Sequence, residues 1–147
     1  MITLKQLQDE WAADSKIDEL NLGAESTKTP ILHSKYLSHL TNFKLHQQKV
    51  ESQRKLIRQY KWKYFRGELS KEELEVLKWE QYLGPQPLKN EMNDFIDSDS
   101  DMIKLDDKIH YIKTCVFQCE TIMKSLNSRT WDIKNAVEWE KFTNGSF

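Results

Sequence analysis

The chain has few residues that interrupt helices and no long apolar run. Only four glycines and three prolines occur among 147 residues, so turns are scarce and long helices are favoured over strands. No apolar run approaches the roughly 18 residues of a membrane span. The first ten residues, MITLKQLQDE, lack the basic and apolar regions of a signal peptide. We therefore expect an all-α protein without a membrane partner.

Motifs of the common enzyme classes are also missing. The sequence contains no phosphate-binding loop, dinucleotide glycine pattern, metalloprotease motif or serine-hydrolase elbow. Four glycines are too few to build a phosphate cradle from backbone amides. The histidines are scattered along the chain: His33, His39, His46 and His110. We therefore expect no catalytic residues, no cofactor and no enzymatic activity.

An alternating acidic run resembles a calcium-binding loop but departs from it at two required positions. Asp97, Asp99 and Asp101 have the spacing of calcium ligands. Met102 stands where that loop needs glycine, and Lys108 stands where it needs a bidentate glutamate. The sequence therefore predicts a solvated acidic loop and no metal site.

Only two cysteines are present, and they are too close in sequence to staple a fold. Cys115 and Cys119 lie four residues apart in a helical pattern and share one face. His110 is out of register with Cys115 for a metal site, and no fourth ligand is evident. We expect two reduced, buried thiols in a cytosolic protein.

Positive charge is concentrated in one segment. Residues 43–66 contain eight Lys or Arg and one acid, Glu51, although the whole chain has a net charge of −1. The end of this segment, RQYKWKYFR, mixes cations with aromatic rings. Cations attract phosphates at any base sequence, and flat rings stack on unpaired bases. The segment therefore predicts a sequence-tolerant contact with single-stranded nucleic acid.

The basic segment belongs to a long predicted helix. Thr29-Pro30 suits a helix start, and no further Gly or Pro occurs before Gly67, which predicts roughly 35 helical residues. One apolar seam recurs every seven residues, at Tyr36, Phe43, Val50, Ile57 and Tyr64. The alternate seam positions become polar: Leu40, Gln47, Arg54 and Lys61. We therefore expect a narrow packed edge beside an open cationic edge.

The candidate DNA-binding residues are the cations and rings on that edge and beside it: Arg54, Lys55, Arg58, Lys61, Trp62, Lys63, Phe65 and Arg66. The ordinary interpretation of a charge run is a solvated surface. Acids are almost absent from this segment, so the ion pairs that decorate an ordinary exposed helix are missing. The rings within the basic edge also favour a nucleic-acid contact.

Shorter helices are predicted before and after the basic segment. A capping box, Thr3 with Gln6, begins a helix over 3–13, and Ser70 with Glu73 begins one over 71–83. Residues 68–107 contain twelve acids and four lysines. We interpret 85–107 as an acidic linker that is solvated, competes with DNA for the basic helix, or meets a basic partner.

The last part of the chain carries an uninterrupted apolar seam. It is followed by a predicted break at Asn127-Ser128 and a final helix to about Phe142. The apolar residues of the seam and of the final helix include Ile109, Ile112, Val116, Cys119, Met123, Leu126, Ile133 and Val137.

Several short blocks are spread along most of the chain. They are Asp14 with Ile17-Asp18, the run Ser34-Lys35-Tyr36-Leu37 after Leu32, the basic stretch ending in Tyr64, Phe65 and Gly67, then Leu105-Asp106, and finally Ser128-Arg129 with Trp131, Ile133-Lys134 and Phe142. In their order, spacing and total length, these blocks resemble the UvsY family, recombination mediators of T-even-type bacteriophages.

The resemblance implies a helical subunit of a ring-like hexamer or heptamer in the host cell cytoplasm. Such a subunit would bind single-stranded DNA, contact a phage single-strand-binding protein, and load a RecA-like phage recombinase. The family's paired cations correspond to Gln59 and Lys61, so the first is replaced here, although Arg58 is adjacent. The implied organisation is a DNA-binding region, 1–84, a linker, 85–107, and an oligomerisation region, 108–147. The family's C-terminal region carries self-association, so the resemblance implies these candidate oligomerisation residues: Ile109, Ile112, Val116, Cys119, Met123, Leu126, Ile133 and Val137.

Two other interpretations remain open from the residues alone. A structural helical adaptor or phage assembly chaperone would explain the heptads equally well, but not the aromatics within the basic helix. A metal-dependent nuclease would need a second acidic cluster, and none has a recognisable spacing.

Overall fold

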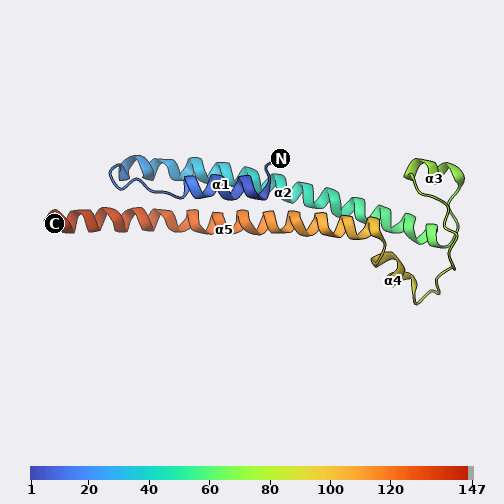
Figure 1. The fold of residues 1–147 in the computed structure, drawn as a ribbon. Coiled ribbons are helices and arrows are strands. Elements are labelled where there is room, and N and C mark those ends of the chain that lie inside the picture. Colours follow the sequence, from blue (N-terminus) through green and yellow to red (C-terminus); the bar gives the residue numbers. More distant parts are fainter. Residues whose placement is uncertain (146–147) are drawn as a thin grey trace. The chain divides into compact units, whose positions relative to one another are not determined.

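The computed structural model describes residues 1–145, and that part of the chain is helical without strands (Figure 1). The predicted all-α class is confirmed. None of the described helices is long and apolar enough to cross a membrane. The helices are α1 (Leu4–Asp14), α2 (Leu22–Phe65), α3 (Lys71–Leu77), α4 (Met92–Asp97) and α5 (Ser100–Thr143).

The chain forms two compact units, and their boundaries differ from the predicted ones. Unit 1 contains Met1–Leu45 and the part of α5 that starts at Ile112, whereas unit 2 is His46–Tyr111. Both long helices contribute to both units, so no boundary falls at residue 84. The functional labels given to 1–84, 85–107 and 108–147 stay predictions.

Unit 1 has a core made by α1, the first half of α2 and the second half of α5. The predicted capping box of α1 is confirmed, since Gln6 N–H donates to Thr3 Oγ1 over 3.1 Å and Thr3 N–H to Gln6 Oε1 over 2.9 Å. The Trp11 ring packs edge-on against Tyr36, with ring centroids 5.4 Å apart. The buried core residues are Leu7, Leu32, Tyr36, Phe43, Cys115, Cys119, Ile122 and Leu126.

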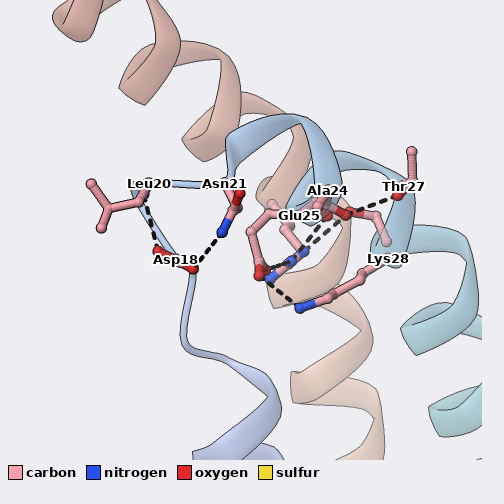
Figure 2. A network of polar contacts seen from close by, with 9 residues as sticks. Asp18, Leu20, Asn21, Ala24, Glu25, Thr27 and Lys28 are labelled. Carbon is pink, nitrogen blue, oxygen red and sulfur yellow. Dashed lines mark hydrogen bonds and ion pairs between the residues drawn. The ribbon is translucent and has the colours of Figure 1, made fainter.

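The predicted start of the long helix at Thr29-Pro30 is wrong, because α2 begins at Leu22. The turn before it is fixed by Asp18, whose carboxylate accepts from Leu20 N–H over 3.0 Å and Asn21 Nδ2 over 3.1 Å (Figure 2). Pro30 therefore lies inside the helix. Thr29 does not act as a cap, and its hydroxyl accepts from Arg129 Nε over 3.1 Å.

A buried ion pair stabilises this first part of α2. Arg129 Nη2 lies 2.6 Å from Glu25 Oε2, and both side chains are 4% exposed. The same nitrogen donates to the Glu25 carbonyl oxygen over 3.1 Å. Lys28 also donates to Glu25 over 2.8 Å (Figure 2). The hydrogen bonds from Lys28 and Arg129 hold the pKa of Glu25 below its usual range.

Unit 2 begins with the basic half of α2, and the predicted end of this helix is confirmed. Gly67 adopts a left-handed conformation with φ 71°. Its N–H donates to the Tyr64 carbonyl over 3.1 Å, and Glu68 N–H donates to the Lys63 carbonyl over 3.0 Å. This pair of bonds is the Schellman arrangement that terminates helices at glycine.

The predicted helix over 71–83 is too long. Ser70 Oγ accepts from Glu73 N–H over 3.2 Å, so Ser70 is the N-cap, and this half of the predicted capping box is confirmed. However, α3 ends at Leu77, and Lys78 has a left-handed φ of 60°. The rings of Trp79 and Tyr82 then pack on Tyr64, with centroid distances of 5.3 and 5.6 Å. Because of this aromatic packing, residues 79–82 do not continue α3.

The acidic residues 85–107 are not a solvated loop, because they contain α4 and the start of α5. Met92, Ile96 and Met102 bury their side chains with Phe65 in the core of unit 2. The Asp99 carboxylate accepts from Asp101 N–H over 3.0 Å and caps α5. Apolar residues between the acids therefore fold this segment onto the end of α2.

The predicted break at Asn127-Ser128 is also wrong, because α5 continues through it to Thr143. Ser128 Oγ lies 3.4 Å from the Lys124 carbonyl oxygen, so its hydroxyl is accommodated within the helix. Burial of Leu126, Arg129 and Ile133 on one face outweighs the weak helix propensity of Asn and Ser.

Candidate nucleic-acid interface

The cationic edge predicted at Arg54, Arg58 and Lys61 is not open. Arg54 donates to both oxygens of Asp106. Arg58 donates to Asp97 Oδ1 over 3.1 Å and to Asn93 Oδ1 over 2.8 Å. The acids absent from the basic segment are supplied by the segment that was predicted to be a linker. The expectation that this edge lacks ion pairs is therefore wrong.

Lys61 is the most enclosed of these cations. Its side chain is 4% exposed, and its Nζ lies 2.9 Å from Asp101 Oδ2 and 3.1 Å from Asp99 Oδ1. The ammonium also lies 4.0 Å from the ring centroid of Trp79 and 5.1 Å from that of Tyr64. Two carboxylates and two rings thus surround the charge, as a desolvated ammonium requires. These contacts of the Lys61 ammonium link the end of α2 to other segments of unit 2 and so help to stabilise the unit.

Two of the aromatic residues in the basic segment are used inside unit 2. The Phe65 ring is buried and packs against Tyr82 and Phe95, with centroids 5.0 and 5.9 Å away. Tyr64 donates to the Glu80 carbonyl over 2.6 Å. The prediction that Phe65 presents its ring to a base therefore conflicts with its buried position. Trp62 is half-buried, packs against the same cluster and lines a cavity beside Arg66.

The opposite face of the basic helix is exposed and cationic. Lys55 and Lys63 are exposed, as predicted, and have no ion-pair partner within residues 1–145. Lys49 shares these properties. Lys49 and Lys63 are two heptads apart and lie within about 40° of each other around the helix axis. Lys49 is not among the DNA-binding residues predicted from the sequence, although its spacing from Lys63 could have identified it.

No exposed acid interrupts this outer face. Between residues 48 and 63 the one acid is Glu51, which is half-buried and accepts from Gln47 over 3.1 Å. The positive surroundings also affect His46, where the helix enters unit 2. Burial lowers the pKa of His46, and Lys108 and Lys49 lower it further. Lys49, Lys55 and Lys63 therefore form an outer cationic face without local neutralisation.

The electrostatics of the inner face are different. The hydrogen bond to Asp106 raises the pKa of Arg54 above its ordinary value, although burial opposes this shift. Arg66 lies at the end of the helix, and its Nε is 3.1 Å from Glu68 Oε1. The basic helix thus has neutralised inner cations, an unpaired outer face, and one paired but half-exposed arginine at its end.

The predicted oligomerisation seam is buried within the subunit. Ile112, Cys119, Leu126 and Ile133 are buried in unit 1, and Ile109 is buried in unit 2. Val116 and Met123 pack against the core of unit 1, and Val137 is half-buried. Burial within a single chain is thus sufficient to account for the seam. Its role in assembly stays a prediction.

The predicted burial of the two cysteines is confirmed. Cys115 and Cys119 are both buried, and they are not joined by a disulfide. Burial, with a smaller contribution from Cys115, raises the pKa of Cys119 to about 11. Among the described residues no group of three metal-ligating side chains is brought together.

Comparisons with known proteins identify a matching family and solved structures that have the fold described above. Residues 10–146 match the family described as "Recombination, repair and ssDNA binding protein UvsY". The chain is 25% identical to the recombination protein uvsY of Enterobacteria phage T4 over 142 residues, which cover 97% of this chain and 98% of that protein.

Solved structures of the bacteriophage T4 recombination mediator protein UvsY share this architecture. One crystal form superposes with a TM-score of 0.82 at 24% identity, covering 98% of this chain and 99% of the other. A second gives 0.78 at 22% identity, covering 97% and 99%. The family match spans nearly the whole chain and both compact units. The chain therefore belongs to the UvsY family of recombination, repair and single-stranded-DNA-binding proteins.

Proposed function

We propose that this protein is a recombination mediator. It binds single-stranded DNA and helps load a RecA-like phage recombinase onto strands covered by a phage single-strand-binding protein. The observation that carries the proposal is the outer cationic face of α2, unpaired and free of exposed acids in a chain whose net charge is −1. The proposed place of action is the host cell cytoplasm.

The proposed DNA contact uses the outer cations and the end of the helix. Lys49, Lys55 and Lys63 bind successive phosphates, and Arg66 with Trp62 extends the contact past the end of α2. Arg54, Arg58, Lys61 and Phe65 position α2 from the inside, since their side chains are engaged by acids or by the aromatic core. The exposed residues thus keep the DNA-binding role predicted from the sequence, whereas the enclosed residues are given a structural role.

The proposed mechanism is non-enzymatic. A contact of a few phosphates per subunit is weak and salt-dependent. A ring-like hexamer or heptamer repeats the contact, and linked sites raise the overall affinity through their effective concentration. DNA held in this way shifts the competition between the recombinase and the single-strand-binding protein for the same strand. No nucleotide hydrolysis is required of the mediator.

We propose that self-association uses the end of α5. Trp131, Trp139 and Phe142 expose 63%, 65% and 61% of their surface, which is unusual for three large rings within four helical turns. Trp131→Lys is expected to reduce the molar mass measured by light scattering, whereas Phe117→Lys, at another exposed ring, serves as the control. Assembly unchanged in Trp131→Lys would move the interface elsewhere on the subunit.

The proposed DNA contact is tested by fluorescence anisotropy of a labelled single-stranded oligonucleotide at several salt concentrations, with duplex as a control. In Lys55→Gln/Lys63→Gln we expect weaker binding and a slope of log K against log salt that is shallower by about 1.4, or 0.7 per lost phosphate contact. The matched control, Lys104→Gln/Lys108→Gln, removes two exposed lysines of α5 in the same unit.

The possible outcomes distinguish a wrong choice of DNA-binding face from a wrong proposed function. Equal binding by both double variants would contradict the outer cationic face as the DNA contact. A wild-type protein that fails to bind the oligonucleotide even at low salt would contradict the proposed function and favour the structural adaptor.

A further inference from the structure

A cavity of about 320 Å³ lies in unit 2 beside the C-terminal end of α2. Its volume is at the lower end of the range of ligand pockets. The lining comes from two segments that are distant in sequence, the end of α2 and the residues leading into α4. The lining residues are Trp62, Arg66, Gln86, Pro87, Lys89 and Met92.

The polar groups of this cavity are hydrogen-bond donors with little internal competition. Lys89 is exposed and has no ion-pair or hydrogen-bond partner within residues 1–145, and the same holds for the amide of Gln86. Arg66 has one partner, Glu68, at 3.1 Å, and both side chains are nearly half exposed. No acid contributes to the lining, although the chain contains 23 Asp and Glu residues. The lining is therefore suited to an anion.

Trp62 gives the same cavity a flat apolar wall. Its indole packs against the aromatic and aliphatic cluster of unit 2 and also lines the cavity. The indole N–H has no hydrogen-bond partner in the described part of the chain. Pro87 and Met92 are buried beside it and add apolar surface. A ring supported from within the protein is a good stacking platform, because stacking then costs little side-chain entropy.

We propose that this cavity is a subsite for one nucleotide unit of a bound single strand. The base stacks on Trp62, and its phosphate lies between Arg66 and Lys89, where it displaces Glu68 from Arg66. The inference rests on the proposed single-strand binding and adds to it a contact with a base. Because every base has a π-face, the subsite is tolerant of sequence but requires an unpaired base.

The test compares a labelled oligothymidylate with an abasic oligomer of the same length and charge. The wild-type protein is expected to bind the oligothymidylate about fivefold or more tightly, the smallest ratio typical of one stacked base. In Trp62→Leu the ratio falls toward one, because the affinity for the oligothymidylate falls more than the affinity for the abasic strand. Lys89→Gln is expected to weaken both strands by similar factors, and Glu68→Gln to strengthen both.

Each outcome bears on the subsite. A ratio near one for the wild-type protein, with both strands bound, would refute the stacking subsite and leave the proposed function standing. A ratio above one that Trp62→Leu preserves would place the stacking elsewhere. Binding of neither strand by the wild-type protein would overturn both proposals. Trp62→Phe, which keeps a ring, is expected to retain part of the ratio, and circular dichroism confirms that each variant is folded.

Discussion

The two halves of α2 follow the same seven-residue spacing but use different chemistry. In unit 1 the inward positions hold Leu32, Tyr36 and Phe43, which are buried in an apolar core. In unit 2 the helix turns Arg54 and Lys61 inward, and both charges meet carboxylates from the chain that precedes and begins α5. One helix is thus stabilised by apolar burial in one unit and partly by ion pairing in the other.

This difference shows that a run of charge in the sequence does not by itself define a surface. Residues 46–111 contain 12 Lys and Arg against 13 Asp and Glu, so unit 2 is close to neutral despite its basic helix. The unpaired cations of the basic half of α2 are on its outer face, where no exposed acid of that helix accompanies them. Charge balance within the compact unit, and not within the segment, separates structural cations from those available to a ligand.

The largest expected effect is the loss of the apolar core in unit 1. Phe43 is 2% exposed, and Phe43→Ala is expected to lower the free energy of unfolding by about 3–5 kcal/mol, since it leaves a large cavity. Urea denaturation followed by circular dichroism measures the change. Leu45→Ala, at a neighbouring residue that is 63% exposed, is the control and is expected to cost under about 0.5 kcal/mol. Similar losses in both variants would contradict the described packing.

The next largest effect is the removal of the enclosed cation in unit 2. Lys61→Met leaves Asp99 and Asp101 without their partner and is expected to cost about 3 kcal/mol, the lower end for a broken buried pair. Asp101 remains 43% exposed, which limits the cost. Lys63→Met, two residues further on the outer face, is the control and is expected to change the free energy of unfolding by about 0.5 kcal/mol or less. Equal losses of stability in Lys61→Met and Lys63→Met would contradict the difference between the enclosed inner face and the exposed outer face of α2.

The sequence predicts the helices well where periodicity and end signals are local. Thr3 caps α1, Gly67 terminates α2, and the heptad positions Tyr36, Phe43 and Val50 are buried. It predicts them poorly where a distant contact decides the outcome. Arg129 donates to Glu25 and Thr29, which lie just before Pro30 in the sequence. These contacts stabilise α2 on the N-terminal side of Pro30, although Thr29-Pro30 has the local pattern of a helix start.

The sequence predicts which helix carries the unpaired cations, but not which face of that helix exposes them. Charge density correctly places free cations such as Lys55 and Lys63 in the basic helix. It cannot tell them from Lys61, because the ion pairs of Lys61 come from acids about forty residues away. The missing information was the fold of 85–107, where Met92 and Ile96 alternate with the acids and direct them onto α2.

A smaller effect is expected from pH, and it concerns Asp14, a carboxylate of α1 that contacts α2 within unit 1. Burial would raise the pKa of Asp14, but hydrogen bonds from Lys35 at 2.7 Å and Tyr36 at 2.7 Å outweigh it and lower the pKa from 3.8. Because the folded pKa lies below the unfolded one, the stabilisation is complete above the unfolded pKa and is lost as pH falls through the folded pKa.

The Asp14→Asn variant isolates this contribution. Its thermal midpoint is expected to lie below that of the wild-type protein at pH 7, with the gap narrowing as the pH falls through the lowered pKa of Asp14 and the wild-type carboxyl becomes protonated. Asp9→Asn, which alters an exposed pair with Lys5 on the same helix, is the control. A gap for Asp14→Asn that does not vary with pH would assign the effect to packing, not to ionisation.

The smallest expected effect on stability tests whether the acidic segment competes with DNA. Asp97 is 58% exposed and Arg58 is 32% exposed, so Asp97→Asn is expected to cost less than about 1 kcal/mol. The same change partly releases Arg58, although Asn93 still accepts from it over 2.8 Å. We therefore expect affinity for a single-stranded oligonucleotide at low salt to rise by at most about fivefold, which corresponds to one exposed charge interaction.

Asp107→Asn provides a matched control, since it removes one exposed negative charge from the same unit, and Asp107 has no ion pair or hydrogen bond with the basic helix within residues 1–145. If the two variants raise the affinity equally, the net charge of unit 2 governs binding and the pairing of Arg58 is irrelevant to DNA. If Asp97→Asn has the larger effect, Arg58 is a cation that becomes available to DNA when its ion pair with Asp97 is broken. In that case the inner face of α2 would divide into an enclosed part at Lys61, which stabilises unit 2, and an exchangeable part at Arg58, where a phosphate and Asp97 compete for one guanidinium group.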